Sequence, residues 1–369
     1  MSAPIHTTLK PGTPIRLALI GFGNAGRIFH APLIASVPGL ELACIVSSQP
    51  QAVAAAWPGV RCAPQAQQAF DDPAVDAVVV ATDNASHHGL ARAALLAGKH
   101  VVVDKPCTPT LAETEDLLAL AARQQRLLTV FQNRRLDGDF LSLQALLADG
   151  TLGRVTHVLS HFDRWRPTVP GRWRDQPVAG AGLWLDLGAH LVDQAVQLFG
   201  VPDALCVDLA QQRDQARVND WFHAQLRFDS RHPGLRVSLH AATLTAEPAP
   251  RFTVHGTGGS YIKWGLDPQE EVLKSGRRPR WADLQDWGQD LGESLRVTRE
   301  PGPDGSQRVT RHVPLRPGNY PAWYANLRDA LWGQADPMVD AQAVRGVMRL
   351  LALGERSARE SRWVGTEAG

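Results

Sequence analysis

A lysine that follows a short apolar run is the first residue of this sequence with a clear chemical use. Val101-Val102-Val103 predicts a buried strand, and Asp104-Lys105-Pro106 follows it directly. Ligands of open α/β sheets bind beyond the carboxyl ends of the parallel strands, which is where Lys105 would lie. Proline restricts the preceding residue to extended conformations, so the backbone of Lys105 is held in one orientation and does not enter a helix. Position alone leaves two interpretations: a ligand-binding cation or a surface lysine before a turn.

A second candidate group is a polar stripe on an apolar helical segment. Asp186, His190 and Asp193 are spaced i, i+4 and i+7, which places them on one face of a helix. Because the rest of the segment is apolar, this face is expected to point into the molecule. The alternatives are a helix-start aspartate and a core histidine. We predict no metal site, because the stripe has one histidine and no second ligand cluster is visible.

A glycine-rich turn lies near the start of the chain. Gly21-Phe22-Gly23-Asn24-Ala25-Gly26 follows an apolar run over residues 15–20 and precedes a helical pattern that extends to Ile34. In this strand–turn–helix order, glycines allow a tight turn and let backbone amides meet a pyrophosphate. The motif therefore predicts a dinucleotide site, whereas the same letters without that context would indicate only a turn.

The dinucleotide is expected to be NAD or NADP, and the end of the second predicted strand favours NADP. An acidic residue that binds the ribose 2′-hydroxyl of NAD is expected there, but the sequence reads Val46-Ser47-Ser48-Gln49. A carboxylate would repel the 2′-phosphate of NADP, so its absence leaves NADP acceptable. This turn has no arginine for such a phosphate, and the hydroxyls of Ser47 and Ser48 would serve either cofactor.

Two strand patterns divide the chain. Up to residue 134, continuous apolar runs alternate with helical stretches such as 90–97 and 111–126, and the runs cover 15–20, 40–46, 77–81, 101–103 and 127–131. Strands buried on both faces of a parallel sheet have this pattern, so residues 1–134 are predicted to form a doubly wound α/β Rossmann domain. Residues 135–369 are predicted to form an α+β domain, because their runs show partial period-two character. These runs cover 155–161, 206–210, 222–228, 235–242 and 251–254, with helices at 185–199, 322–332 and 341–356.

Composition narrows the range of partners. The 369 residues include 38 Lys and Arg against 37 Asp and Glu, a balance that favours neither nucleic acid nor an anionic membrane. No apolar run approaches the roughly 18 residues of a membrane span, and Met1–His6 lacks a signal-peptide apolar stretch, so we expect a cytoplasmic protein.

Residues 267–318, rich in Pro, Gly, Asp and Arg, are expected to be irregular. The scattered cysteines are predicted to be buried thiols: Cys44, Cys62, Cys107 and Cys206.

Together these motifs resemble the glucose-fructose oxidoreductase / inositol dehydrogenase / MocA (Gfo/Idh/MocA) family. Asp104-Lys105-Pro106 is similar to its Glu/Asp-Lys-Pro motif, and Gly180-Ala181-Gly182-x-x-x-Asp186-x-x-x-His190 to its helix with an Asp and a His four apart. Within the family, the chain closely resembles bacterial scyllo-inositol dehydrogenases over nearly its whole length. That likeness rests on residues 26–32, 133–135, 172–174, 190–194, 259–263 and 318–321. One departure is Asp83, where the family usually has proline.

The resemblance implies a fold, an assembly and a reaction. The fold is a Rossmann domain followed by an open antiparallel sheet, with the last helices packed on the first domain, and the sheet is expected to form a homodimer or homotetramer. The reaction is NAD(P)-dependent interconversion of a cyclic polyol, scyllo-inositol first, and its ketone. Cofactor contacts are expected from Gly21, Phe22, Gly23, Asn24, Ala25, Gly26, Ser47, Ser48, Thr82, Asn84, His87, Asp104, Lys105 and Asn133.

The resemblance assigns catalysis to Lys105, Asp186 and His190, and alcohol chemistry gives each a task. A base must take the hydroxyl proton while a cation meets the negative charge that grows on oxygen. His190, with an ordinary pKa of about 6.5, suits the first task and Lys105 the second, while Asp186 orients His190. The lysine as base is the alternative. The polyol is expected to contact Lys105, Asn133, Arg134, His161, Asp163, Trp165, Arg172, Trp173, Asp186 and His190, with Asp163 and Arg172 as the preferred pair.

Three other functions compete with this interpretation. One is oxidation or reduction of another sugar by a similar site. The second is a cofactor-binding sensor without catalysis, because the resembling family also contains a transcriptional corepressor. The third is a structural interaction protein. The combined presence of Lys105, Asp186 and His190 favours an enzyme.

Overall fold

The computed structural model describes residues 9–302 and 305–366, which divide into two compact units. The opening segment Met1–His6 lies outside the described residues. The first unit contains the chain up to Leu136 together with Gln269–Trp287 and Asn319–Met348. The second contains Asp137–Pro268, Gly288–Gly318 and the chain from Arg349 onward. Two later segments therefore complete the first unit.

A six-stranded parallel sheet lies at the centre of the first unit, in the order β3-β2-β1-β4-β5-β6. Every residue of β4 and β5 is buried, which explains their continuous valines. This strand order is that of a doubly wound dinucleotide fold, so the predicted Rossmann domain is confirmed. The strands are β1 (Ile15–Ile20), β2 (Leu40–Val46), β3 (Arg61–Ala63), β4 (Ala77–Val80), β5 (His100–Val103) and β6 (Leu128–Val130).

Two helices of this unit begin at residues that favour a helix start. Helix α5 opens with a capping box, in which Thr110 and Glu113 satisfy each other's backbone amides. Helix α9 begins with a proline in its first turn and packs against α1. The helices are η1 (Ala25–His30), α1 (Ala31–Ser36), α2 (Pro50–Ala56), α3 (Gln67–Phe70), η2 (Asn84–Ser86), α4 (His87–Leu96), α5 (Leu111–Gln124), η3 (Asn133–Leu136), α8 (Gln269–Lys274), η6 (Trp281–Asp286) and α9 (Pro321–Leu331).

The second unit contains a nine-stranded sheet in the order β14-β13-β12-β11-β7-β10-β9-β8-β15. Strands β7 and β10 are parallel and the other pairs are antiparallel, which confirms the predicted α+β class. The strands are β7 (Val155–His161), β8 (Ala204–Ala210), β9 (Trp221–Arg227), β10 (Arg236–Ala242), β11 (Phe252–Gly256), β12 (Gly259–Lys263), β13 (Ser294–Gly302), β14 (Gly305–His312) and β15 (Val364–Gly365). The helices are α6 (Gly138–Ala148), η4 (Trp173–Asp175), η5 (Trp184–Gly188), α7 (Ala189–Phe199) and α10 (Ala341–Glu360), which has residues in both units.

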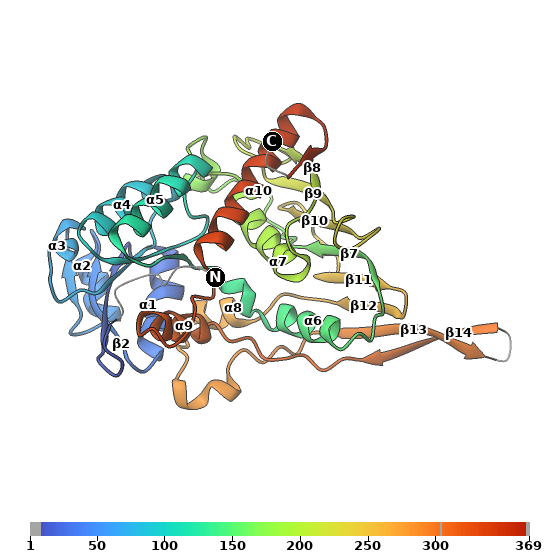
Figure 1. Cartoon of the computed structure of the whole chain (residues 1–369), viewed down its shortest axis with the longest axis horizontal. Coiled ribbons are helices and arrows are strands. Elements are labelled where there is room, and N and C mark those ends of the chain that lie inside the picture. The colour runs from blue at the N-terminus through green and yellow to red at the C-terminus, as the bar shows by residue number, and fades with distance from the viewer. Residues whose placement is uncertain (1–8, 303–304, 367–369) are drawn as a thin grey trace. The chain divides into compact units, whose positions relative to one another are not determined.

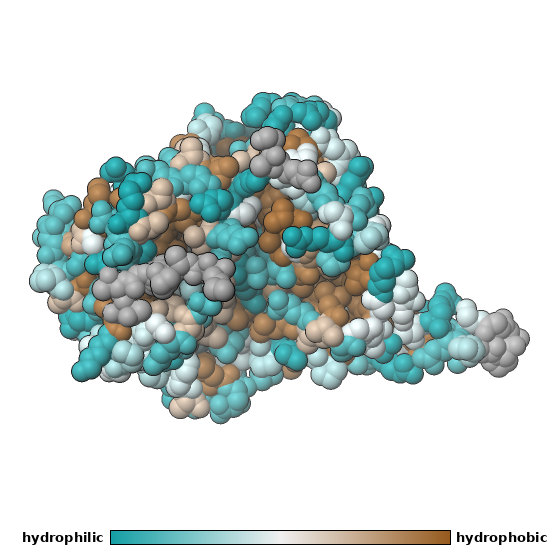
Figure 2. All heavy atoms as spheres, viewed as in Figure 1, coloured by the Kyte–Doolittle hydropathy of each residue, from teal (hydrophilic) through white to brown (hydrophobic). Residues whose placement is uncertain are grey.

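Strands β13 and β14 correct the expectation of irregular structure over residues 267–318. They form a hairpin that extends beyond the other strands of this sheet (Figure 1). The visible surface of this arm is largely hydrophilic or neutral (Figure 2), and apolar alternation is confined to Leu295 and Val297, too short a pattern to predict two strands. Backbone pairing of β13 with β12 and β14 supplies the order instead.

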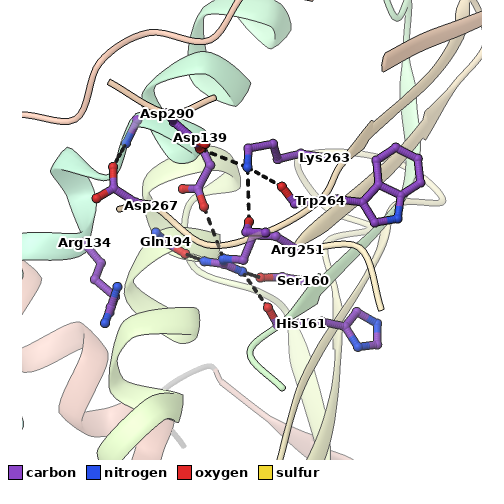
Figure 3. A network of polar contacts seen from close by, with 12 residues as sticks. Arg134, Asp139, Ser160, His161, Gln194, Arg251, Lys263, Trp264, Asp267 and Asp290 are labelled. Carbon is purple, nitrogen blue, oxygen red and sulfur yellow. Dashed lines mark hydrogen bonds and ion pairs between the residues drawn. The ribbon is translucent and has the colours of Figure 1, made fainter. Parts of the chain in front are cut away.

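A buried polar network connects four elements of the second unit (Figure 3). Arg251 is 2% exposed. Its guanidinium donates hydrogen bonds to Ser160 Oγ on β7 and to Gln194 Oε1 on α7, and each of these bonds is 2.6 Å long. Its Nε lies 3.6 Å from a carboxylate oxygen of Asp139, at the start of α6. The ammonium of Lys263, at the end of β12, lies 2.9 Å from Asp290. These charges are buried in pairs, as low-dielectric interiors require.

Two further expectations concern membranes and thiols. In the part of the chain that the structure describes, no helix combines the length and apolar character needed to cross a bilayer. All four cysteines are free thiols. Cys44 and Cys107 are buried as predicted, and burial raises the pKa of Cys107 to about 12. Cys62 and Cys206 are only half-buried, because they lie on strands whose side chains alternate between packed and open faces.

Candidate active site

The glycine turn after β1 has the shape that a dinucleotide pyrophosphate requires. Gly21 has φ +100°, and a Cβ there would lie 2.6 Å from the Ala81 carbonyl oxygen. A Cβ on Gly26 would clash with the Gly21 carbonyl oxygen, so these two glycines close the turn. Gly23 faces open space, because a Cβ added there would have nothing within 4 Å. The first and last glycines thus make the turn possible, and the middle one leaves room for a phosphate.

The turn between β2 and α2 carries hydroxyls and no carboxylate. Ser47 is half-buried, and its Oγ accepts a hydrogen bond of 3.0 Å from the Gln49 amide. Ser48 and Gln49 are exposed. The side chains available beside a ribose 2′ position on this turn are therefore uncharged, as the sequence indicates.

In the segment after β4, Asp83 stands where the family usually has proline and stabilises the local conformation by capping a short helix. Asp83 caps the short helix η2, because its side chain accepts from the Ser86 amide at 3.2 Å. The Ser86 hydroxyl also contacts Thr82 Oγ1 at 2.7 Å. Asn84 is buried at the first position of η2. Asp83 thus stabilises the turn that presents Thr82 and Asn84.

His87 joins this turn to the segment that carries Lys105. Its Nδ1 lies 3.0 Å from the Pro106 carbonyl oxygen, and the ring is fully buried. Burial lowers the pKa of His87, so its neutral form is favoured. The Lys105–Pro106 peptide bond is cis. The Lys105 amide donates a hydrogen bond of 2.8 Å to Asp104 Oδ1. His87 therefore connects the two segments, and its predicted cofactor contact stays a prediction.

A buried anion lies directly before Lys105. Burial alone would raise the pKa of Asp104, but the contact and charge of His30 and the charges of Lys105 and His87 lower it to about 2. His30 Nε2 lies 3.9 Å from Asp104, and its Nδ1 lies 2.6 Å from the Tyr324 hydroxyl. Burial raises the pKa of Tyr324, so the phenol keeps its proton. His30 thus lies between a neutral hydroxyl and the Asp104 carboxylate.

Sequence reasoning missed this His30–Asp104–Tyr324 cluster. Tyr324 lies on α9, 294 residues after His30, and belongs to the first unit with it. The cluster keeps the Asp104 carboxylate ionised, so a negative charge lies next to the positive charge of Lys105. His30 lies within the family-like segment 26–32, whereas Tyr324 gave no local signal.

The stripe on α7 differs from the expected regular helix at its first turn. Asp186 lies in the π-helical turn η5, whereas His190 and Asp193 lie in α7. A Cβ on Gly188 would lie 2.7 Å from the Trp184 ring, so this glycine lets the turn pack closely on the tryptophan. His190 and Asp193 are buried, as predicted, while the Asp186 carboxylate is 26% exposed and lies 3.9 Å from Arg174.

The remaining predicted substrate residues lie in three different settings. Asn133 and Arg134 are buried in η3 of the first unit, where Arg134 forms an ion pair with Glu270. Arg172 lies 3.9 Å from Asp175 in the second unit, and Trp165 is 58% exposed. His161 and Asp163 lie together, 3.3 Å apart. Asp163 and Arg172, the preferred pair, thus have separate partners.

Comparison with known proteins places both halves of the chain in one family. Residues 15–132 match the oxidoreductase family with an NAD-binding Rossmann fold, and residues 140–262 match the GFO/IDH/MocA C-terminal domain. The chain belongs to the Gfo/Idh/MocA family. It is an oxidoreductase with a nicotinamide-dinucleotide fold, as predicted.

Two relatives and one solved structure cover almost the whole chain. The uncharacterized oxidoreductase YdgJ of Escherichia coli is 50% identical over 345 residues, 94% of this chain and 96% of its own. The scyllo-inositol 2-dehydrogenase (NADP(+)) IolW of Bacillus subtilis is 32% identical over 353 residues, 95% of each. The structure of YPO2259 from Yersinia pestis has a TM-score of 0.90 at 45% identity and covers 97% of this chain and 99% of its own.

The open position at Gly23 gives this Gfo/Idh/MocA protein a direct test of cofactor binding. Gly23→Asp is expected to weaken NAD(P) binding by about 100-fold or more, because opposing like charges costs several kcal/mol. The fold should survive, since nothing crowds this position. Gly89→Asp is the matched control, because Gly89 is an equally open glycine on α4. Calorimetric titration that shows equal affinity for the two variants would contradict the assignment.

Proposed function

We propose that this protein interconverts a cyclic polyol and its ketone, with scyllo-inositol as the first substrate and NADP as the preferred cofactor. The observation that carries the proposal is His190, a buried histidine one helical turn after Asp186 on an otherwise apolar segment. A buried histidine beside a carboxylate suits proton transfer near neutral pH. The likeness to IolW supports both the substrate and the cofactor.

The proposed chemistry gives each catalytic residue one task. The nicotinamide, when bound, accepts the hydride from the alcohol carbon or returns it to the ketone. His190 takes the hydroxyl proton, and Lys105 donates a hydrogen bond to the oxygen on which negative charge grows. Asp186 stabilises the imidazolium that forms. Asp104 is ionised in its buried position and accepts a hydrogen bond from the Lys105 amide, which fixes the backbone that carries the lysine.

The cofactor residues of the proposal are those of the first unit. The amides of residues 21–26 would hold the pyrophosphate, and Ser47 and Ser48 would meet the adenosine ribose. Thr82 and Asn84 lie on the capped turn after β4, at the carboxyl edge of the same sheet. Each of these groups is uncharged, which leaves a 2′-phosphate acceptable.

The test is an assay of inositols and sugars with NAD and NADP separately. The absorbance of the reduced nicotinamide reports turnover, and scyllo-inositol with NADP is expected to give the highest kcat/KM. Turnover of a different sugar alone would move the assignment to another substrate. Tight cofactor binding without turnover of any member of the panel would favour the sensor function.

Ser47→Asp is expected to shift cofactor preference toward NAD by about 10- to 100-fold, because a carboxylate binds the ribose 2′-hydroxyl and repels the 2′-phosphate. The turn should persist, since an aspartate oxygen can accept the Gln49 amide as Ser47 Oγ does. Ser47→Asn keeps the shape without the charge and is the control. The ratio of kcat/KM for NAD and NADP is the measurement, and an unchanged ratio in Ser47→Asp means that this turn does not meet the ribose.

A further inference from the structure

Three histidines lie side by side on one face of the sheet in the second unit. The strand register pairs His161 of β7 with His240 of β10, and His240 with His223 of β9. Their sequence neighbours Phe162, Leu239 and Phe222 are buried and therefore point to the opposite, packed face. The histidine rings of His161 and His240 have centroids 5.2 Å apart.

Asp163 adds a carboxylate to this row. It follows His161 by two residues, so the two side chains share a face. One carboxylate oxygen lies 3.3 Å from His161 Nδ1 and the other 3.5 Å from His240 Nε2. One donor atom from each of the three residues lies within 4.8 Å of the other two. The Asp163 side chain is 3% exposed, while the two histidines are about one-fifth exposed, so a small ion can reach the cluster.

The donor atoms of this cluster have unmet bonding capacity. His161 Nδ1 and an oxygen of Asp163 are buried and have no hydrogen-bond partner. Burying such groups is unfavourable unless a partner compensates them.

We propose that His161, Asp163 and His240 bind one divalent transition-metal ion, for which zinc is the best match. Ligand atoms about 2.0–2.1 Å from tetrahedral zinc lie roughly 3.3 Å from one another. The two oxygens of Asp163 lie at 3.3 and 3.5 Å from the nearest histidine nitrogens, and the three ligand atoms lie within 4.8 Å, so small side-chain shifts would close the site around an ion. Two imidazoles and a carboxylate suit zinc better than the oxygen-seeking calcium or magnesium. A water completes the fourth position. The ion joins the end of β7 to the end of β10 and stabilises this part of the sheet.

These ligands do not include the proposed catalytic residues Lys105, Asp186 and His190, and the proposal gives His161 and Asp163 a metal in place of their predicted polyol contacts. A metal site was not predicted, because the helical stripe has one histidine and no second ligand cluster is visible in the sequence. Only the fold brings together His161 and His240, which are 79 residues apart. The site is also tested by metal binding rather than by turnover, so its failure and the failure of the proposed function are distinguishable.

The test is a titration of chelator-treated protein with Co²⁺, followed by displacement with Zn²⁺. One Co²⁺ per chain is expected to bind with visible d–d absorption, and Zn²⁺ is expected to remove this absorption and to raise the melting temperature. Asp163→Asn and His240→Asn should each weaken binding by about 100-fold or more, since even outer-shell partners of a metal ligand are worth about 10- to 100-fold.

His255→Asn is the matched control. His255 lies on the same sheet face in a second histidine pair, with its ring centroid 6.1 Å from that of His157. Its Nδ1 already contacts Ser260 Oγ at 2.8 Å, so it should not contribute to the metal. The control variant is expected to bind Co²⁺ as the native protein does. No binding by native protein at micromolar Co²⁺ or Zn²⁺ would overturn the proposal, as would equal loss in the control or full binding by Asp163→Asn and His240→Asn.

Discussion

Replacing His190 with alanine is expected to slow polyol oxidation by about 100- to 10,000-fold, which is the usual worth of general base catalysis. Dinucleotide binding should survive, because its predicted residues lie in the first unit and His190 lies in the second. The measurement is kcat at saturating cofactor, with cofactor affinity from calorimetry and folding checked by thermal melting. His190 is buried, so His190→Gln is a second variant that better preserves packing.

Lys105→Met should reduce turnover by a similar factor, because it keeps the apolar stem and removes the charge that stabilises the alkoxide. Asp186→Asn should reduce turnover less, since it preserves shape and removes the charge that favours the imidazolium. Near-native turnover of both His190→Ala and Lys105→Met on every oxidised polyol would refute the catalytic assignment.

Buried strands were predictable from sequence, and exposed ones were not. Strands β4 and β5 are buried throughout, so their valines form unbroken runs with one interpretation. The β13–β14 hairpin is ordered by backbone hydrogen bonds, which do not depend on the polarity of the side chains and therefore give no pattern in the sequence. The strand patterns predict one change of domain near residue 134, and the family resemblance implies that the last helices pack on the first domain. Helix α9 belongs to the first unit and packs against α1. Residues Gln269–Trp287 also belong to this unit, and no local pattern predicted it, because such a return depends on long-range packing.

Site residues were predictable where one short segment contains the whole motif. The glycine turn and Asp104-Lys105-Pro106 each occupy consecutive positions, and both lie at the carboxyl edge of the parallel sheet. Asp104 also depends on His30 and Tyr324, which only the fold brings to it. The η5 turn was mispredicted because the helical spacing rule assumes a regular turn, whereas Trp184–Gly188 form a π-helical one.

Arg251→Met is expected to lower the free energy of unfolding by about 3–5 kcal/mol, the usual cost of removing one member of a buried ion pair. The variant fills much of the same volume but removes the guanidinium from Asp139, which is fully buried. It also removes both hydrogen bonds of 2.6 Å that Arg251 donates to Ser160 and Gln194. Urea unfolding at neutral pH measures the loss.

The double variant Arg251→Met/Asp139→Asn separates charge from packing. If the buried Asp139 carboxylate causes most of the loss, neutralising it should restore a substantial part of the stability. Arg251→Lys is the complementary variant, because it keeps a cation but cannot reproduce the fixed fork of donors. A loss below about 1 kcal/mol in Arg251→Met would mean that Asp139 is compensated by other groups of the network. Because Gln194 follows His190 by one helical turn on α7, a fall in kcat that exceeds the loss of folded protein would show that the network also positions His190.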